Sequence, residues 1–303
     1  MHIVVLGAGA GGGFPQWNCS CSNCSGLRAG TLNAQARTQS SIAISADGEN
    51  WLLCNASPDI LTQLSNTPLL HPRGLRESPI KAILFVDSQI DHTTGLLMLR
   101  EGCPHHVYSS DMVYEDLTSG FPIFSLLKSW NGGITHHSLA VDGEDFKMPQ
   151  IAGLSFRTYA IEGKAPPYSP HRNDPHPGDN IALVITDESN GSKCVYAPGV
   201  YTIPEALRKE MADADCIMID GTFWQEDEMA LNGVGTKRAK DMGHLPQSGA
   251  GGMIEELSGY SKSRRVLIHI NNTNPILNND SSERKILDGE GIEVAYDGME
   301  IIL

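Results

Sequence analysis

The stretch Asp87-Ser88-Gln89-Ile90-Asp91-His92-Thr93-Thr94-Gly95 carries the strongest information about the fold. It follows the apolar run Ala82–Val86, which predicts a buried strand, and leads into Thr93–Arg100, whose apolar spacing predicts a helix. In α/β proteins, residues at the ends of strands meet at one rim of a sheet, where binding sites are built. This position makes Asp91 and His92 candidate functional residues, although Asp91 could equally cap the helix and His92 could be an ordinary loop residue.

Other histidines lie in comparable positions and favour the functional interpretation. His269 ends an apolar, strand-like run, and His244 follows Gly243 ahead of a predicted helix. His176 lies in the Pro-rich stretch Ala165–Pro177, a predicted loop of a length that is usually functional. We therefore expect several of these side chains to meet at one site.

Three Asp-Gly or Asn-Gly turns predict β-hairpins, the last of them joining Ile292–Ala295 to Met299–Ile302. Between the hairpins, apolar strands are followed by helical patterns. The turns are Asp47-Gly48, Asn190-Gly191 and Asp297-Gly298; the strands are His2–Leu6, Ala82–Val86, Cys216–Ile219 and Val266–Ile270; the helices are Thr93–Arg100, Pro204–Ala212 and Pro246–Leu257. This order predicts an α/β fold of two mixed sheets sandwiched between helices, as one domain over residues 1–303.

The composition of the chain bears on which kinds of partner it can bind. The chain has 303 residues, 40% of them hydrophobic, and a formal net charge of −14. Such an acidic surface repels phosphate backbones and anionic lipid, so we expect neither nucleic acid nor a membrane as partner. No apolar run approaches the roughly 20 residues of a membrane span, and no Lys or Arg precedes Arg28 as a signal peptide would require. We expect a soluble, cytoplasmic protein, with its oligomeric state, a homo-oligomer included, left open.

The glycine-rich loop Gly7–Gly13 follows the first predicted strand and satisfies the dinucleotide pattern G-x-G-x-x-G. Dinucleotide binding also needs a helix that starts at the loop and an acidic strand end about 20 residues later. Neither is present, because the loop continues into Phe14-Pro15. We therefore expect these glycines to let the backbone pass close to a neighbouring site.

Three of the seven cysteines, Cys19, Cys21 and Cys24, lie within six residues of one another. Three thiolates so close together are typical of a zinc site whose fourth ligand comes from elsewhere in the chain, the alternative being three free thiols in a loop. We expect structural zinc here. The cysteines in apolar runs are expected to be inert core residues, namely Cys54, Cys194 and Cys216.

Asp91-His92-Thr93-Thr94-Gly95-Leu96 resembles the end of the H-x-H-x-D-H motif of the metallo-β-lactamase superfamily. The Cys-x-Cys-x-x-Cys cluster resembles the phosphodiesterase and ribonuclease Z-like branch of that superfamily. Gly12–Cys19 and Asp87–Gly95 are most similar to the coenzyme PQQ synthesis B (PqqB) family, and this resemblance extends over the whole chain. It implies a metallo-β-lactamase-like αββα sandwich.

The resemblance also implies which metal ligands remain. Asp91, His92 and His269 match the ligands of one metal, and His176 matches the histidine of the middle loop. The two leading histidines are replaced by Asp87 and Gln89, and the bridging carboxylate by Pro198-Gly199. A chain with these losses cannot hold a hydroxide between two metals. Two histidines and one carboxylate with open positions are typical of non-haem Fe(II) chemistry.

For function, the resemblance implies pyrroloquinoline quinone (PQQ) biosynthesis, with iron- and oxygen-dependent hydroxylation of the tyrosine ring in a Glu-Tyr unit of the precursor peptide. Such an oxygenase needs Fe(II), dioxygen and a reductant, and other divalent metals could substitute for iron. The alternatives are a metal-dependent hydrolase and a non-enzymatic PQQ carrier. Four further residues have candidate roles. His244 either donates to substrate or dioxygen or is an ordinary loop histidine, and Asp220 either orients a ligating histidine or caps the next turn. Arg172 is the candidate contact for the acidic substrate, and an amide oxygen of Asn272 or a water completes the zinc shell.

Overall fold

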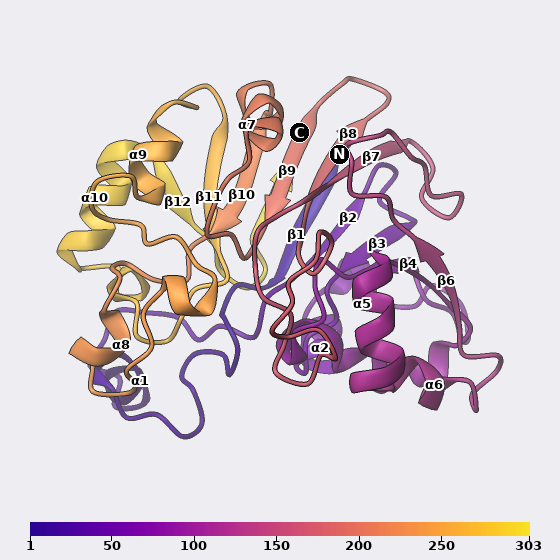
Figure 1. Ribbon diagram of the computed structural model, residues 1–303, viewed down its shortest axis with the longest axis horizontal. Coiled ribbons are helices and arrows are strands. Elements are labelled where there is room, and N and C mark those ends of the chain that lie inside the picture. Colours follow the sequence, from indigo (N-terminus) through magenta and orange to yellow (C-terminus); the bar gives the residue numbers. More distant parts are fainter.

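Two β-sheets pack face to face in the computed structural model, which describes residues 1–303 (Figure 1). The first sheet has the order β13-β1-β2-β3-β4-β5-β6, and the second has the order β12-β11-β10-β9-β8-β7. The strands of the first sheet are β1 (His2–Gly7), β2 (Ser41–Ser45), β3 (Trp51–Cys54), β4 (Ile80–Leu84), β5 (His105–Ser109), β6 (Ile134–Ser138) and β13 (Glu300–Ile302). Those of the second are β7 (Leu154–Ala160), β8 (Ile181–Asp187), β9 (Lys193–Ala197), β10 (Cys216–Asp220), β11 (Arg264–Ile268) and β12 (Ile292–Val294).

In both sheets, from β1 to β6 and from β7 to β12, antiparallel strand pairs come first along the chain and parallel pairs follow. Each starts with antiparallel hairpin neighbours, as in β2 with β3 and β8 with β9, and continues through parallel strands reached by crossovers. Both hairpins were predicted from their Asp-Gly and Asn-Gly turns and are confirmed.

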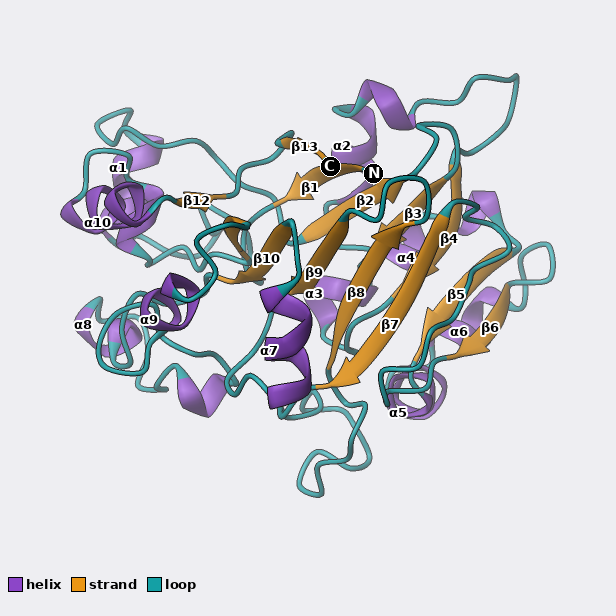
Figure 2. Cartoon of the chain, turned by 90° about the horizontal axis from the view of Figure 1, so that it is seen from above, coloured by secondary structure: helices purple, strands orange, loops and turns teal.

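Helices cover the outer face of each sheet (Figure 2). Apolar side chains of α2, α4, α5 and α6 pack on the first sheet, and those of α1, α7, α9 and α10 pack on the second. The bounds are α1 (Ser22–Arg28), α2 (Ile60–Ser65), α3 (Ile90–Thr93), α4 (Gly95–Met98), α5 (Asp111–Glu115), α6 (Ile123–Leu127), α7 (Glu205–Ala212), α8 (Glu228–Leu231), α9 (Met253–Ser258) and α10 (Ser282–Glu290). The predicted αββα sandwich is thereby confirmed. No helix is both long enough and apolar enough to cross a bilayer.

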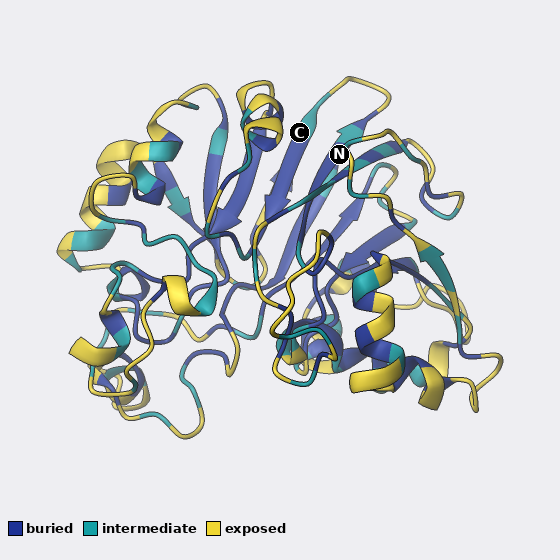
Figure 3. Ribbon diagram, in the orientation of Figure 1, coloured by how far each residue is buried: buried dark blue, intermediate teal, exposed yellow.

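The apolar run of β1 shows why the strands are buried on both faces (Figure 3). Ile3 and Val5 point into the core between the two sheets, whereas Val4 and Leu6 point into the core beneath the helices. Side chains alternate along a strand, so a continuous apolar run serves two cores at once. Cys54, Cys194 and Cys216 are buried in the core between the sheets, as predicted.

The predicted C-terminal hairpin is wrong. Ile292–Val294 forms β12, which pairs with β11 in the second sheet, whereas Glu300–Ile302 forms β13, which pairs with β1 in the first. The Asp297-Gly298 turn therefore carries the chain from one sheet to the other. The Asp297 carboxylate accepts hydrogen bonds from the backbone of Ala8 and Thr38, which fixes this crossing.

Two predicted helices differ in extent from the observed ones. The helix expected over Thr93–Arg100 starts earlier and is interrupted between α3 and α4, where a Cβ on Gly95 would lie 2.1 Å from the Ser57 carbonyl oxygen. The helix expected over Pro246–Leu257 starts only at Met253. Asp91 lies inside α3 rather than at its N-cap, so the capping interpretation of this residue is wrong.

Candidate metal centre

The ends of β4 and β11 bring Asp91, His92 and His269 together at the rim where the two sheets meet. Asp91 and His92 lie in α3, which follows β4 after a short loop, and His269 follows β11 directly. His269 has a left-handed backbone conformation, with φ of +61°, which is uncommon for a residue with a side chain and concentrates at functional sites.

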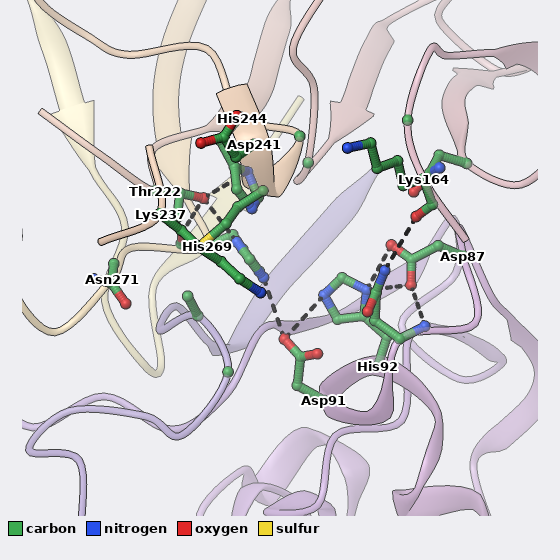
Figure 4. Close-up of a pocket in the computed structure, with 18 of the residues that line it drawn as sticks. Asp87, Asp91, His92, Lys164, Thr222, Lys237, Asp241, His244, His269 and Asn271 are labelled. Carbon is green, nitrogen blue, oxygen red and sulfur yellow. Dashed lines mark hydrogen bonds and ion pairs between the residues drawn. The ribbon is translucent and has the colours of Figure 1, made fainter. Parts of the chain in front are cut away.

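One ligand atom from each of these residues lies within 4.8 Å of the other two. The Asp91 Oδ2 atom is 3.3 Å from His269 Nε2 and 3.8 Å from His92 Nε2, and the three side chains point toward one another (Figure 4). His92 Nε2 is buried and has no hydrogen-bond partner. An orphaned imidazole nitrogen that faces a carboxylate and a second imidazole fits a metal ligand.

Asp87 orients His92. Its two carboxylate oxygens lie 2.8 and 2.9 Å from His92 Nδ1, which fixes the proton on that nitrogen and leaves Nε2 facing the cluster. The same carboxylate accepts a hydrogen bond from the backbone N–H of Gln89. Asp87 therefore positions a candidate ligand without being one.

Asp220 and Thr222 orient the two histidines on the opposite side. The Thr222 hydroxyl donates to Asp220 Oδ1 and lies 2.9 Å from His269 Nδ1, so the Nε2 atom of His269 is left for a metal. Asp220 Oδ2 is 2.7 Å from His244 Nδ1, and the His244 ring stacks on His269 with a centroid distance of 5.3 Å. Asp220 thus acts on His244 directly and on His269 through Thr222.

The charges of the cluster favour a proton or a cation between its members. Burial opposes ionisation of Asp91, but the charge of His92 and the hydrogen bond from His269 outweigh it and hold the pKa of this carboxyl well below its usual range. Burial also disfavours charged His92, yet the carboxylates of Asp87 and Asp91 raise its pKa to about 9. Metal ligands must be deprotonated, so a cation that binds Nε2 would displace this proton.

The cluster lies in a pocket of about 310 Å³ with a polar lining. Gly11 and Gly199 contribute no side chain to its wall, and a Cβ on Gly11 would lie 3.3 Å from Asp91 Oδ2. The glycine-rich loop therefore passes close to the site, as predicted. Lys164 lies on the Asp87 side of the pocket, and Lys237 lies on the His269 side (Figure 4).

The cysteine cluster forms a second group of candidate ligands. The Sγ atoms of Cys19, Cys21 and Cys24 lie within 4.8 Å of one another. The side-chain amide of Asn272 is 3.2 to 3.6 Å from all three sulfurs, and exchanging its nitrogen and oxygen by a flip presents an oxygen to them. Three thiolates and one oxygen suit zinc, and Asn272 lies where the fourth ligand was expected.

Known proteins with the same sequence pattern identify the family. Residues 50–270 match the Beta-lactamase superfamily domain. The chain is 59% identical to coenzyme PQQ synthesis protein B of Stutzerimonas stutzeri and 57% identical to that of Pseudomonas savastanoi pv. phaseolicola, and each alignment covers 100% of both chains. The chain belongs to the PqqB family.

A solved PqqB structure agrees with this assignment. The crystal structure of Zn(2+)-bound PqqB from Methylobacterium extorquens superposes with a TM-score of 0.91 at 39% identity and 100% coverage of both chains. The resemblance noted for Asp87–Gly95 is therefore confirmed, as is the metallo-β-lactamase fold of this PqqB-family chain.

Not every expected residue of the PqqB-family site joins the cluster. His176, expected as a possible ligand, has an exposed side chain that lies near Asp174 and does not line the pocket. Arg172 does line the pocket. The sequence does not predict the orienting roles of Asp87 and Thr222, because Asp87 occupies the position of a lost ligand and nothing marks Thr222.

A buried carboxylate, Glu228, lies beside the segment that carries His269. It begins α8, is 3% exposed, and accepts hydrogen bonds from the Thr273 hydroxyl at 2.5 Å and the Trp224 N–H at 2.6 Å. Burial raises its pKa to about 7, and these hydrogen bonds reduce the shift only in part. The folded protein is therefore expected to keep a proton on Glu228 up to about pH 7, whereas the unfolded chain loses it near pH 4.5.

We expect this proton to make stability depend on pH. The free energy of unfolding should fall as pH rises from about 4.5 to about 7, by roughly 3 kcal/mol for the full shift, and level off above it. Glu228→Gln should remove this fall, whereas exposed Glu290→Gln should keep it. Urea unfolding at several pH values measures the difference, and parallel pH profiles of Glu228→Gln and wild type would contradict the prediction.

Proposed function

We propose that this chain acts in PQQ biosynthesis as an Fe(II)- and dioxygen-dependent hydroxylase of the tyrosine ring in a Glu-Tyr unit. One observation carries the proposal: two imidazole nitrogens and one carboxylate oxygen converge in the pocket, from His92, His269 and Asp91. The names of the relatives, coenzyme PQQ synthesis protein B, support the pathway.

The donor set favours oxygen chemistry over hydrolysis. Two histidines and one carboxylate leave coordination positions open, the arrangement used by non-haem iron oxygenases. Fe(II) in this site would supply the redox chemistry that zinc lacks. Hydrolysis with two metals is disfavoured, because Gly199 lines the pocket where the resemblance puts a bridging carboxylate.

The protein's own groups prepare the site. Asp87 and Thr222 fix which nitrogen of His92 and His269 is free to bind a metal. His244 has its Nδ1 bound to Asp220, so its Nε2 is available to donate or accept a proton at the substrate. The pocket walls orient the tyrosine ring against the open face of the three ligands.

The test compares iron-loaded with zinc-loaded protein. Each is given Glu-Tyr dipeptide, dioxygen and ascorbate as reductant, and oxygen uptake and hydroxylated product are followed by electrode and mass spectrometry. We expect product with iron and none with zinc. Equal turnover with zinc would favour a hydrolase, and tight binding of PQQ without any turnover would favour a carrier; either result overturns the proposal.

A further inference from the structure

The connection between β7 and β8, residues 161–180, forms one wall of the candidate metal pocket. It contains no helix or strand. Several of its residues line the pocket, namely Glu162, Gly163, Lys164, Pro167, Arg172 and Asn180. Its position therefore decides which groups a substrate meets beside the metal ligands.

The His171 imidazole, which is 10% exposed, lies between two buried carboxylates, that of Asp179 in this loop and that of Asp116 outside it. His171 Nε2 lies 2.9 Å from Asp179 Oδ1 and 3.7 Å from Asp116 Oδ1. The side chains of Asp116 and Asp179 are 0% and 1% exposed, and neither these two oxygens nor His171 Nε2 forms a hydrogen bond, so charge attraction is what links them. The remaining oxygen of Asp116 accepts a hydrogen bond from the Ser88 hydroxyl at 2.6 Å. Without His171, two carboxylates would face each other in the interior, which is strongly unfavourable.

Further contacts join this loop to the segments that contain Ser88, Ser110 and Gly120. A Cβ on Gly120 would lie 2.4 Å from the Tyr168 carbonyl oxygen, so the loop passes too close for any side chain there. The Tyr168 hydroxyl donates to the Ser88 carbonyl, and the Ser110 hydroxyl donates to the Gly178 carbonyl at 2.5 Å. Ser88 adjoins Asp87, which orients His92, so the loop and the metal ligands share one framework.

Arg172 directly follows His171 and faces the pocket. Its guanidinium donates to the Ala165 carbonyl but forms no ion pair with a carboxylate within 4.0 Å, and the ammonium group of Lys164, in the same pocket, forms none either. A guanidinium has five donors, so most of them remain for a ligand. The acidic residues of the same pocket repel anions elsewhere on its wall; they are Asp87, Asp91, Glu162 and Asp241.

We propose that Arg172 forms a subsite for a substrate carboxylate and that His171 is the positioning residue that holds it there through Asp116 and Asp179. The inference rests on the proposed function, since it assigns the residue that binds the acidic end of a Glu-Tyr unit. His171 does not touch the substrate, so its effect passes entirely through the position of Arg172.

The test measures binding of Glu-Tyr to zinc-loaded protein by calorimetry, where no redox turnover can interfere. We expect His171→Ala and Arg172→Met each to weaken binding by about 10-fold or more, and the double variant to be no weaker than Arg172→Met alone, because residues acting through one contact are not additive. Asn173→Ala, an exposed neighbour outside the pocket, is the matched control and should bind like wild type. Asp116→Asn repeats the His171 test if His171→Ala fails to fold.

Analogues that lack one carboxylate show whether Arg172 binds a carboxylate of the substrate. Gln-Tyr and Glu-Tyr amide each lack one carboxylate, and one of them should bind wild type and Arg172→Met equally. With iron, His171→Ala should raise KM and leave kcat and bound iron nearly unchanged. If wild type binds Glu-Tyr and both variants bind it equally well, or if their effects add, the subsite is refuted while the proposed function stands. If wild type does not bind Glu-Tyr, both fall together.

Discussion

We expect replacement of His269 by alanine to abolish the proposed hydroxylation and to prevent iron from binding at Asp91 and His92. The reason is geometric, because only Asp91 and His92 of this three-residue group would remain to bind the ion. His92→Ala should behave in the same way. We expect the loss of affinity to exceed the roughly 10–100-fold that the loss of a supporting hydrogen bond causes.

Asp87→Asn is the graded control for this prediction. It keeps the shape of the group that faces His92 Nδ1 but removes its charge, so iron binding should weaken without disappearing. Gln89→Ala should matter least, because the Gln89 side chain lines the pocket and donates only one long hydrogen bond, to the Lys164 carbonyl at 3.5 Å. Iron content after dialysis, measured with oxygen uptake, ranks the variants; a His269→Ala protein that keeps one iron per chain would refute the assignment.

The second large effect is expected at the cysteine cluster. Cys21→Ser should lose the zinc and lower the free energy of unfolding by more than about 4 kcal/mol, since loss of a bound metal belongs to the largest class of mutational effects. The zinc would tie α1 to the segment after His269, which Asn23 already holds through hydrogen bonds to the carbonyls of Asn272 and Asn274.

Cys103→Ser is the control for the loss of a thiol without the loss of zinc, because it removes a buried cysteine outside the cluster. That variant should keep its zinc and lose far less stability. At low temperature, Cys21→Ser protein that remains folded should still bind iron at Asp91, His92 and His269. Zinc content and urea unfolding give the answer, and a zinc-free Cys21→Ser protein as stable as wild type would contradict a structural role.

The sequence predicts the parts of this fold that depend on local patterns. Asp87–Gly95 follows a buried strand and contains α3, and that local context places Asp91 and His92 at the rim. The Asp297-Gly298 turn has the same local signal as the two true hairpins. The two strands that flank it join different sheets, because the Asp297 carboxylate accepts hydrogen bonds from the backbone of Ala8 and Thr38, which are far away in the sequence. Such long-range contacts leave no local trace.

The same limit explains the errors at the site. His176 has the residue type and loop position of a ligand, but the course of residues 161–180 exposes its side chain. Asp87 and Thr222 act through hydrogen bonds to histidines. The first contact depends on the conformation of the loop before α3, and the second appears only when β10 and β11 are placed side by side. Residue types that bind metals can be read from a sequence, whereas the groups that orient them depend on packing.

The split of the ligands between the two sheets sets an order of assembly. His269 is the ligand whose side chain lies closest to Asp91 in space, yet the two residues are 178 positions apart in the sequence. As the chain leaves the ribosome, the first half displays an incomplete pair while the second sheet is still being synthesised. A cation meets all three ligands only after the sheets have packed, so its binding energy stabilises that packed state alone. The metal would therefore raise the free energy of unfolding of the two packed sheets together and of neither sheet alone.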